Sequence, residues 1–120
     1  MITEISILGT EYEIVRKDYK DDPYFEKDGI DGYCDGYLKK IVVGNLRTFP
    51  NYEGEFEGSI KESEKQTLRH EIVHAFLDES GLNDSAAQYY DAWSKNEEMV
   101  DWFAWQGPKI YEAWKQVDAL

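Results

Sequence analysis

Cysteine and histidine are scarce in this sequence, and this limits the chemistry that the chain can carry. Among 120 residues there are one cysteine, Cys34, and two histidines, His70 and His74. A single cysteine excludes an internal disulfide and a cysteine-based zinc site, which needs several thiolates. We therefore expect Cys34 to be a reduced residue packed in a strand rather than a ligand that caps a metal ion.

Long apolar runs and positive charge are also in short supply. No stretch approaches the roughly 20 apolar residues that cross a bilayer, and the N-terminus lacks the basic region and apolar run of a signal peptide. The 25 acidic and 13 basic residues give a formal net charge of −12, which repels phosphate backbones and anionic membranes. We expect a soluble, cytoplasmic protein that binds neither nucleic acid nor membranes.

The sequence does contain enough apolar material for one compact domain over residues 1–120, since 42% of it is hydrophobic and 15% aromatic. Residues 2–8 and 11–16 alternate polar and apolar side chains, which predicts a β-hairpin. A second strand pair is expected at 33–34 and 37–43, around the turn dipeptide Asp35-Gly36.

Two segments between the predicted elements are rich in turn residues. Residues 17–32 hold Asp, Lys, Pro and Gly, and residues 44–58 hold Pro50 and three glycines, so we expect irregular structure in both. The acidic run from Asp18 to Asp31 lacks the ligand rhythm of an EF-hand and is expected to be a solvated loop rather than a calcium site.

Helical periodicity begins near residue 60. Four residues form one apolar stripe (Leu68, Ile72, Ala75 and Phe76). A capping box is expected at Ser63–Gln66 or at Ser59–Glu62, and Gly81 is expected just beyond the helix end.

A second helix is predicted from Ser94 or Asn96 to Gln106, with a break or kink at Gly107-Pro108 and a last helix over 109–118. Five aromatic residues at roughly helical spacing are expected in the core (Trp93, Trp102, Phe103, Trp105 and Trp114). The predicted fold class is α+β, with a small antiparallel or mixed sheet packed on the first helix.

Both histidines fall in one motif, His70-Glu71-Ile72-Val73-His74, inside the first predicted helix. Residues four apart lie one turn apart on the same helix face, so the two imidazoles can reach one ion. Glu71 lies about 100° round the helix from His70 and can lean toward a metal-bound water without being a ligand. We expect the apolar stripe on the opposite side of the helix, away from the metal.

These residue types suit zinc chemistry. Zinc binds neutral imidazole and carboxylate, and a catalytic site has three protein ligands and a water. The metal makes that water more acidic and polarises a carbonyl, while a carboxylate passes the proton to the leaving amine. We therefore expect His70 and His74 as metal ligands and Glu71 as the general base.

A third ligand is predicted in Asn96-Glu97-Glu98-Met99-Val100-Asp101, where Glu97 follows His74 by 97 − 74 = 23 residues. With the HExxH motif, this Asn-Glu-x-x-x-Asp pattern resembles the gluzincins, the thermolysin-like metallopeptidases. The resemblance extends to their reduced forms, the minigluzincins, and to small phage or prophage metallopeptidase-like proteins. It implies Glu97 as the third zinc ligand and Asp101 as the partner of a ligating histidine. Glu98 is the rival ligand, about 100° away on a helix.

The resemblance implies a zinc-dependent peptidase that cleaves a peptide or protein substrate. Tyr89 or Tyr90 would then be a candidate donor to the developing oxyanion, although packing in a loop is the commoner use of such residues. A strand at 38–43, at the sheet edge, would align the substrate by strand addition. The alternative is a zinc-stabilised interaction or regulatory module without catalysis, for instance one encoded by a phage, which would tolerate Glu71→Gln.

Overall fold

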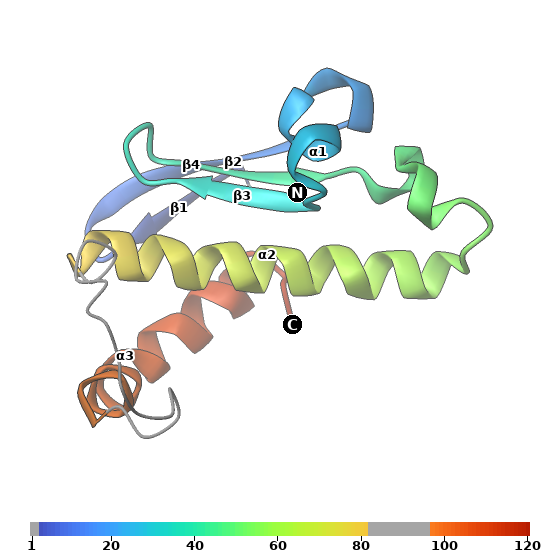
Figure 1. Cartoon of the computed structure of the whole chain (residues 1–120). Coiled ribbons are helices and arrows are strands. Elements are labelled where there is room, and N and C mark those ends of the chain that lie inside the picture. The colour runs from blue at the N-terminus through green and yellow to red at the C-terminus, as the bar shows by residue number, and fades with distance from the viewer. Residues whose placement is uncertain (1–2, 82–96) are drawn as a thin grey trace.

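The computed structural model describes residues 3–81 and 97–120, in which a four-stranded sheet packs on two long helices (Figure 1). Within these residues no helix combines the length and apolarity of a membrane span. The elements are β1 (Glu4–Ile7), β2 (Thr10–Lys17), α1 (Pro23–Asp28), β3 (Gly32–Asp35), β4 (Lys40–Gly44), α2 (Glu57–Glu79) and α3 (Glu97–Gln116), with short 3-10 helices at Tyr19–Asp21, Leu46–Thr48 and Pro50–Tyr52.

The sheet is mixed and has the strand order β1-β2-β4-β3. β1 and β2 form an antiparallel pair, as do β3 and β4, so both predicted strand pairs are confirmed. β2 and β4 run parallel, with Ile14 opposite Ile41. This parallel pairing places β4 in the interior of the sheet and leaves β1 and β3 at its edges.

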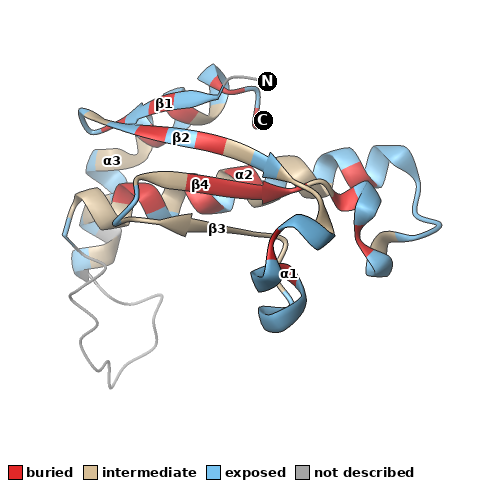
Figure 2. Cartoon of the chain, turned by 90° about the horizontal axis from the view of Figure 1, so that it is seen from above, coloured by how far each residue is buried: buried red, intermediate tan, exposed pale blue. Residues whose placement is uncertain are grey.

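The sheet is covered on both faces around β4. Figure 1 shows α2 and α3 on one side of the sheet and α1 on the other, and in Figure 2 β4 is the most continuously buried strand. Ile41 and Val43 point to the α2 side, while Val42 belongs to a separate cluster on the α1 side. A strand buried on both faces takes an uninterrupted apolar run, which explains the sequence Ile-Val-Val.

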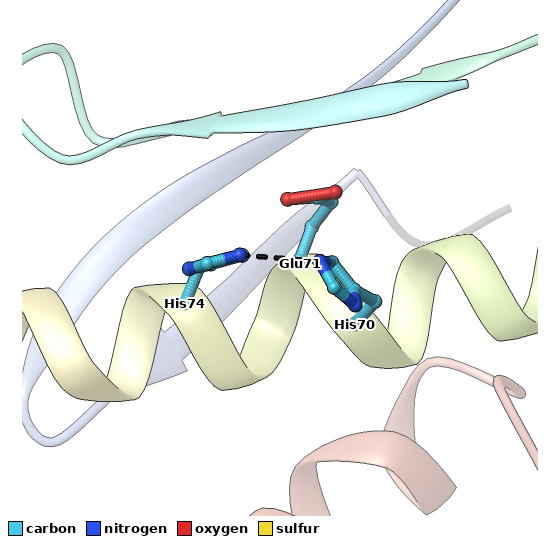
Figure 3. Close-up of side chains that lie close together, drawn as sticks. All are labelled: His70, Glu71 and His74. Atoms are coloured by element: carbon cyan, nitrogen blue, oxygen red, sulfur yellow. Dashed lines mark hydrogen bonds between the residues drawn. The ribbon is translucent and has the colours of Figure 1, made fainter. Parts of the chain in front are cut away.

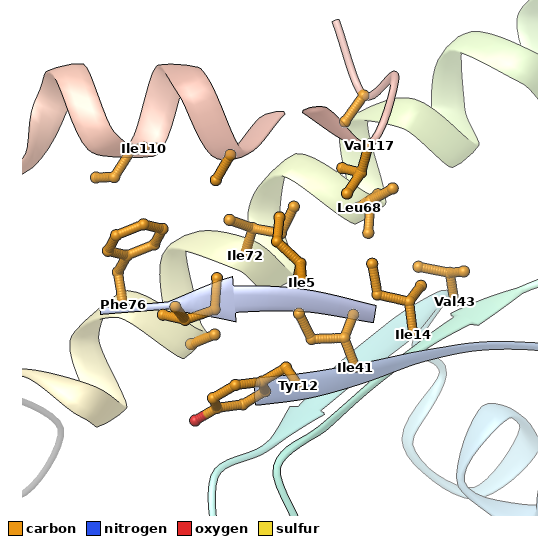
Figure 4. Packing of buried hydrophobic residues seen from close by; sticks show 14 residues of the cluster. Ile5, Tyr12, Ile14, Ile41, Val43, Leu68, Ile72, Phe76, Ile110 and Val117 are labelled. Atoms are coloured by element: carbon orange, nitrogen blue, oxygen red, sulfur yellow. The ribbon is translucent and has the colours of Figure 1, made fainter. Parts of the chain in front are cut away.

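Two apolar clusters hold the layers together, and burial of each large side chain contributes about 1.5–3 kcal/mol. The larger one lies between the sheet and the two long helices, and Figure 4 shows Leu68, Ile72 and Phe76 of the predicted helix stripe inside it. Its buried members are Ile5, Ile7, Tyr12, Ile14, Ile41, Val43, Leu68, Ile72, Ala75, Phe76, Ile110, Ala113, Val117 and Ala119; the smaller cluster has Phe25, Val42, Leu46, Phe49 and Ile60.

Residues 17–32 were expected to be a loop, and this is wrong for Pro23–Asp28, which form α1. Asp22 caps the helix by accepting a hydrogen bond from the Tyr24 N–H. Pro23 occupies the first turn, where an N–H would have no intrahelical acceptor, so its missing N–H costs no hydrogen bond. Phe25 is buried and Gly29 ends the helix with a φ of 63°. Burial of Phe25 therefore holds α1 in place, although the helix is too short to show a helical pattern in the sequence.

Asp22 joins α1 to the edge strand β3. Its carboxylate accepts hydrogen bonds from the Tyr33 hydroxyl (2.5 Å) and from Lys17 Nζ (3.3 Å). Burial alone would raise the pKa of Asp22, but the hydrogen bonds from Tyr33, Tyr24 and Lys17 outweigh it and hold the pKa below its ordinary value. The charged form of Asp22 therefore stabilises the folded chain.

Asp22→Asn is expected to lower the free energy of unfolding at pH 7 by about 1–3 kcal/mol, because it removes a charged acceptor from a buried network. A lowered pKa makes this contribution present above the ordinary value of about 3.8 and lost as the pH falls below it. Urea unfolding at pH 7 and at pH 3 measures the difference. Asp21→Asn, at the exposed neighbouring position, is the matched control; an equal loss there would contradict the assignment.

The ends of α2 were predicted unequally well. The helix begins at Glu57, after Phe56, which makes no side-chain cap bond, so both predicted capping boxes are wrong. Ser59 and Ser63 lie inside the helix instead. The helix begins before them because Ile60 is buried in the smaller cluster, which packs the first turn against the rest of the domain. The C-terminal prediction is confirmed: Gly81 follows the helix with a φ of 76°.

The sequence predicted a break or a kink at Gly107-Pro108, and the break is wrong, because α3 continues through these residues. Pro108 cannot donate to the carbonyl four residues earlier, but that residue, Ala104, is exposed and its carbonyl can bind water. Ile110 is buried two residues after Pro108, so packing holds the helix together.

Of the five aromatic residues expected in the core, Trp102 and Trp114 do pack against it. The expectation is wrong for Trp105 and Phe103, which are 80% and 40% exposed. Trp93 lies outside the described residues.

Candidate metal centre

The middle of α2 brings the two imidazoles together. The Nε2 atoms of His70 and His74 are 3.1 Å apart, and the ring centroids are 4.8 Å apart in an edge-to-face arrangement. Figure 3 shows both rings reaching toward one another along the helix, with Glu71 between them and directed toward the sheet. Both histidines are exposed, as ligands open to an incoming ion must be.

The spacing of these nitrogens suits zinc. Two imidazole nitrogens at about 2.0–2.1 Å from one zinc ion, with a tetrahedral angle between them, are about 3.3–3.4 Å apart. The observed 3.1 Å needs only a small opening of the two rings. His70, Glu71 and His74 offer ligand atoms within 4.8 Å of one another. The donor set therefore fits zinc, with two imidazoles available and further ligands required.

Glu71 is buried, in contrast to its two neighbours in the motif. Its side chain is 6% exposed, and no described residue donates a hydrogen bond or forms an ion pair with its carboxylate. Burial raises the pKa of Glu71 to about 7. A carboxyl group with this pKa can both take and return a proton near neutral pH.

The apolar stripe of α2 is buried while His70 and His74 are exposed, as expected for a stripe that faces away from the metal ligands. Glu71 differs from the two histidines, because it points into the contact of α2 with β3 and β4. The motif thus straddles the boundary between the core and the solvent, with the carboxylate inside and the imidazoles outside.

His74 is held in the form that binds metals. Although His74 is exposed at its rim, the surrounding protein partly desolvates its ring, and this desolvation and the neighbouring His70 lower the pKa of His74, while the carboxylate of Asp78, one turn further on, opposes them. A neutral imidazole has a free lone pair for an ion. Sequence reasoning missed Asp78, although its position four residues after His74 places it on the same helix face.

A cleft of about 500 Å³ opens beside His70 and Glu71. One wall is the segment from Gly29 to Gly32, which leads into β3, and the opposite wall is α2. Tyr52 closes one end by donating a hydrogen bond to Asp31 (2.7 Å). A second cleft, of about 600 Å³, follows β3 further along and shares Ile30 with the first.

The strand that borders both clefts is β3. The edge strand was expected at residues 38–43, and this is wrong: β4 (Lys40–Gly44) is paired with β2 on one side and with β3 on the other. β3 is the outer strand on the side of α2. No strand of the described residues pairs with its outer edge, so this edge is the candidate for an extended peptide near Glu71.

Comparison of the chain with known protein families, with curated proteins and with solved structures gives no match.

The predicted third ligand falls at the limit of the described residues. Glu97 is the first residue of α3, but its side chain lies outside the described part, as do Asn96, Tyr89 and Tyr90. Glu98 and Asp101 are both exposed on the first turns of α3. The roles of Glu97, Asp101 and the two tyrosines therefore remain predictions from the sequence.

Cys34 lies in β3 as a partly buried residue that packs against the larger cluster, as the sequence predicted. Its thiol donates a hydrogen bond to Asp78 Oδ2 at 3.7 Å. Burial and the nearby carboxylates of Asp78 and Glu71 raise the pKa of this thiol to about 12. Cys34 is therefore a protonated packing residue at neutral pH.

Proposed function

We propose that this protein is a zinc-dependent peptidase in which His70, His74 and Glu97 hold the metal and Glu71 is the general base. The observation that carries the proposal is the buried carboxylate of Glu71, which no other described residue pairs with, beside two imidazole nitrogens 3.1 Å apart. A structural zinc site has no use for such a carboxylate, whose burial without a partner is unfavourable. Hydrolysis does, since it needs a proton acceptor close to the metal.

When bound, zinc supplies Lewis-acid chemistry, which polarises a peptide carbonyl and makes water more acidic. Glu71 accepts the proton of the attacking water and returns it to the leaving amine. Its pKa of about 7 matches this double role, because such a group is basic enough to take up a proton and acidic enough to release it near neutral pH. The neutral form of His74 keeps that ring available as a ligand.

The outer edge of β3 provides a place for the substrate. An extended peptide that adds to this edge would pair with the main chain of Gly32–Asp35 and run past Glu71. The two clefts on either side of Ile30 would take side chains of the peptide. Main-chain pairing is tolerant of sequence, so the clefts rather than the strand would set the cleavage preference.

Zinc binding and chelator-sensitive cleavage together test the proposal. Protein purified without added metal and then titrated is expected to bind about one zinc per chain, with affinity that falls in acid as protons compete with the metal for the lowered-pKa imidazole of His74. Elemental analysis gives the stoichiometry, and mass spectrometry of a peptide library gives the cleavage.

His70→Ala and His74→Ala should each remove both zinc and activity, whereas Glu62→Ala, at an exposed position of the same helix, should change neither. Failure of the wild-type protein to take up zinc or any other transition metal would refute the proposal.

A further inference from the structure

A cleft of about 1060 Å³ lies on the other side of α2 from the histidines. Its apolar floor is made by Val43, Leu68 and Val117, which Figure 4 shows grouped at one end of the core. Leu68 and His70 are two positions apart in the helix and therefore point about 200° apart. This second cleft is thus separate from the candidate metal centre.

The rim of this cleft is basic. Four cationic side chains line it (Arg16, Arg47, Lys61 and Lys65), against two anionic ones (Glu64 and Asp118), so the lining has a net charge of 4 − 2 = +2. The whole chain has a net charge of −12. A local excess of positive charge in so acidic a protein attracts an anionic partner that the rest of the surface repels.

Arg16 and Arg47 are held in ion pairs with described residues, and the two lysines of the rim are not. Arg16 Nη2 lies 2.9 Å from both oxygens of Glu64, and Arg47 is paired with Glu57. Lys61 and Lys65 lie one turn apart on α2, and neither forms an ion pair with a described residue. The ammonium group of Lys61 is therefore open to an incoming carboxylate, and that of Lys65 can meet one by exchanging its hydrogen bond to the main chain of Leu120.

We propose that this basic cleft, defined by Val43, Leu68 and Val117 as floor and by the four cations as rim, docks an acidic segment of another protein. Carboxylates of the segment would meet Lys61 and Lys65, and one apolar side chain would lie on the floor. The apolar contact supplies affinity, while the charges steer the encounter and set its orientation. A second copy of this chain is a poor occupant, since two chains of charge −12 repel one another.

Fluorescence anisotropy with a labelled peptide, Glu-Asp-Glu-Leu-Glu-Asp-Glu, tests the proposal at low salt. Saturable binding is expected, and the variant Lys61→Gln/Lys65→Gln should weaken it by at least about tenfold. Replacing the leucine of the peptide with serine should also weaken binding. The matched control is Lys20→Gln/Lys27→Gln, which removes the same charge from two exposed lysines elsewhere and should change the affinity by less than about twofold.

Three results would overturn the proposal. These are no saturable binding up to about 1 mM peptide, equal weakening in the control variant, and tighter binding of an oligothymidylate than of the peptide, which would point to a nucleic acid instead. Lys65 also donates a hydrogen bond to the main-chain oxygen of Leu120 (3.1 Å). If the double variant does not fold, Lys61→Gln alone is the test, because Lys61 is exposed.

Discussion

Glu71→Gln is expected to lower the rate of peptide hydrolysis by about 10²–10⁴-fold while the zinc content stays near that of the wild type. Glutamine preserves the size and shape of the side chain but cannot accept the proton of the attacking water. Zinc should be retained because the two imidazoles at 3.1 Å are unchanged. The measurement is cleavage of a peptide library by wild type and variant, each with its metal content determined and with a chelator control.

The same substitution should raise the stability of the metal-free protein at alkaline pH. The pKa of Glu71 is raised to about 7 in the folded chain, so ionisation opposes folding increasingly as the pH rises from the ordinary value of 4.5 to above 7. At pH 9 the variant should be more stable by up to about 3 kcal/mol, and at pH 4 the difference should vanish. Urea unfolding in the presence of a chelator measures this, with the exposed Glu62→Gln as the control.

These two readouts separate the possible outcomes. Equal cleavage by wild type and variant would point to a contaminating protease. A zinc-loaded wild type that cleaves nothing across a broad library would count against the peptidase and favour a zinc-stabilised interaction module. Unchanged stability at pH 9 would show that Glu71 is solvated rather than buried, and would remove the observation on which the proposed function rests.

Glu97→Ala should weaken zinc binding by more than about 100-fold, while Glu98→Ala should leave it nearly unchanged. The loss for Glu97 should exceed the roughly 10–100-fold expected for Asp101→Asn, because Asp101 would act only through a hydrogen bond to a ligating histidine. Glu97 and Asp101 are four residues apart in α3 and share a helix face, whereas Glu98 is rotated by about 100°. Competition with a fluorescent zinc chelator measures the affinities.

Glu98 is the matched control here, since it carries the same carboxylate one position away and is exposed. A strong loss for Glu98→Ala with none for Glu97→Ala would mean that the helical register inferred from the Asn-Glu-x-x-x-Asp pattern is wrong. No loss for either would mean that the third ligand comes from elsewhere in the chain.

The sequence predicted those features that depend on neighbouring residues. Alternation along β1 and β2, the stripe from Leu68 to Phe76 and the spacing of His70 and His74 each follow from local periodicity, and the structure has them as expected. Local periodicity could not predict that Glu71 faces the core, because this position depends on which face of α2 lies under β3. That contact joins residues about forty positions apart, which no local pattern records.

The edge of the sheet was misplaced for the same reason. The segment 38–43 has the β-branched composition of a strand, but composition does not state which strands lie beside it. Because Ile14 of β2 pairs with Ile41 of β4, β4 lies inside the sheet. The edge strand on that side is β3, which has four residues. The uninterrupted apolar run of β4 indicates a strand that is buried on both faces of the sheet. A search for alternating polar and apolar residues does not detect such a strand.

The parallel contact between β2 and β4 has a consequence for how the chain folds. Each hairpin can form from adjacent residues, but joining the two requires residues 14 and 41 to meet, which closes a loop that contains α1 and β3. Closing such a loop reduces the conformational entropy of the chain before any stabilising contact forms. Non-local sheet pairing of this kind slows folding. The rate-limiting event for this small domain is therefore expected to be the docking of two preformed hairpins rather than the growth of either one.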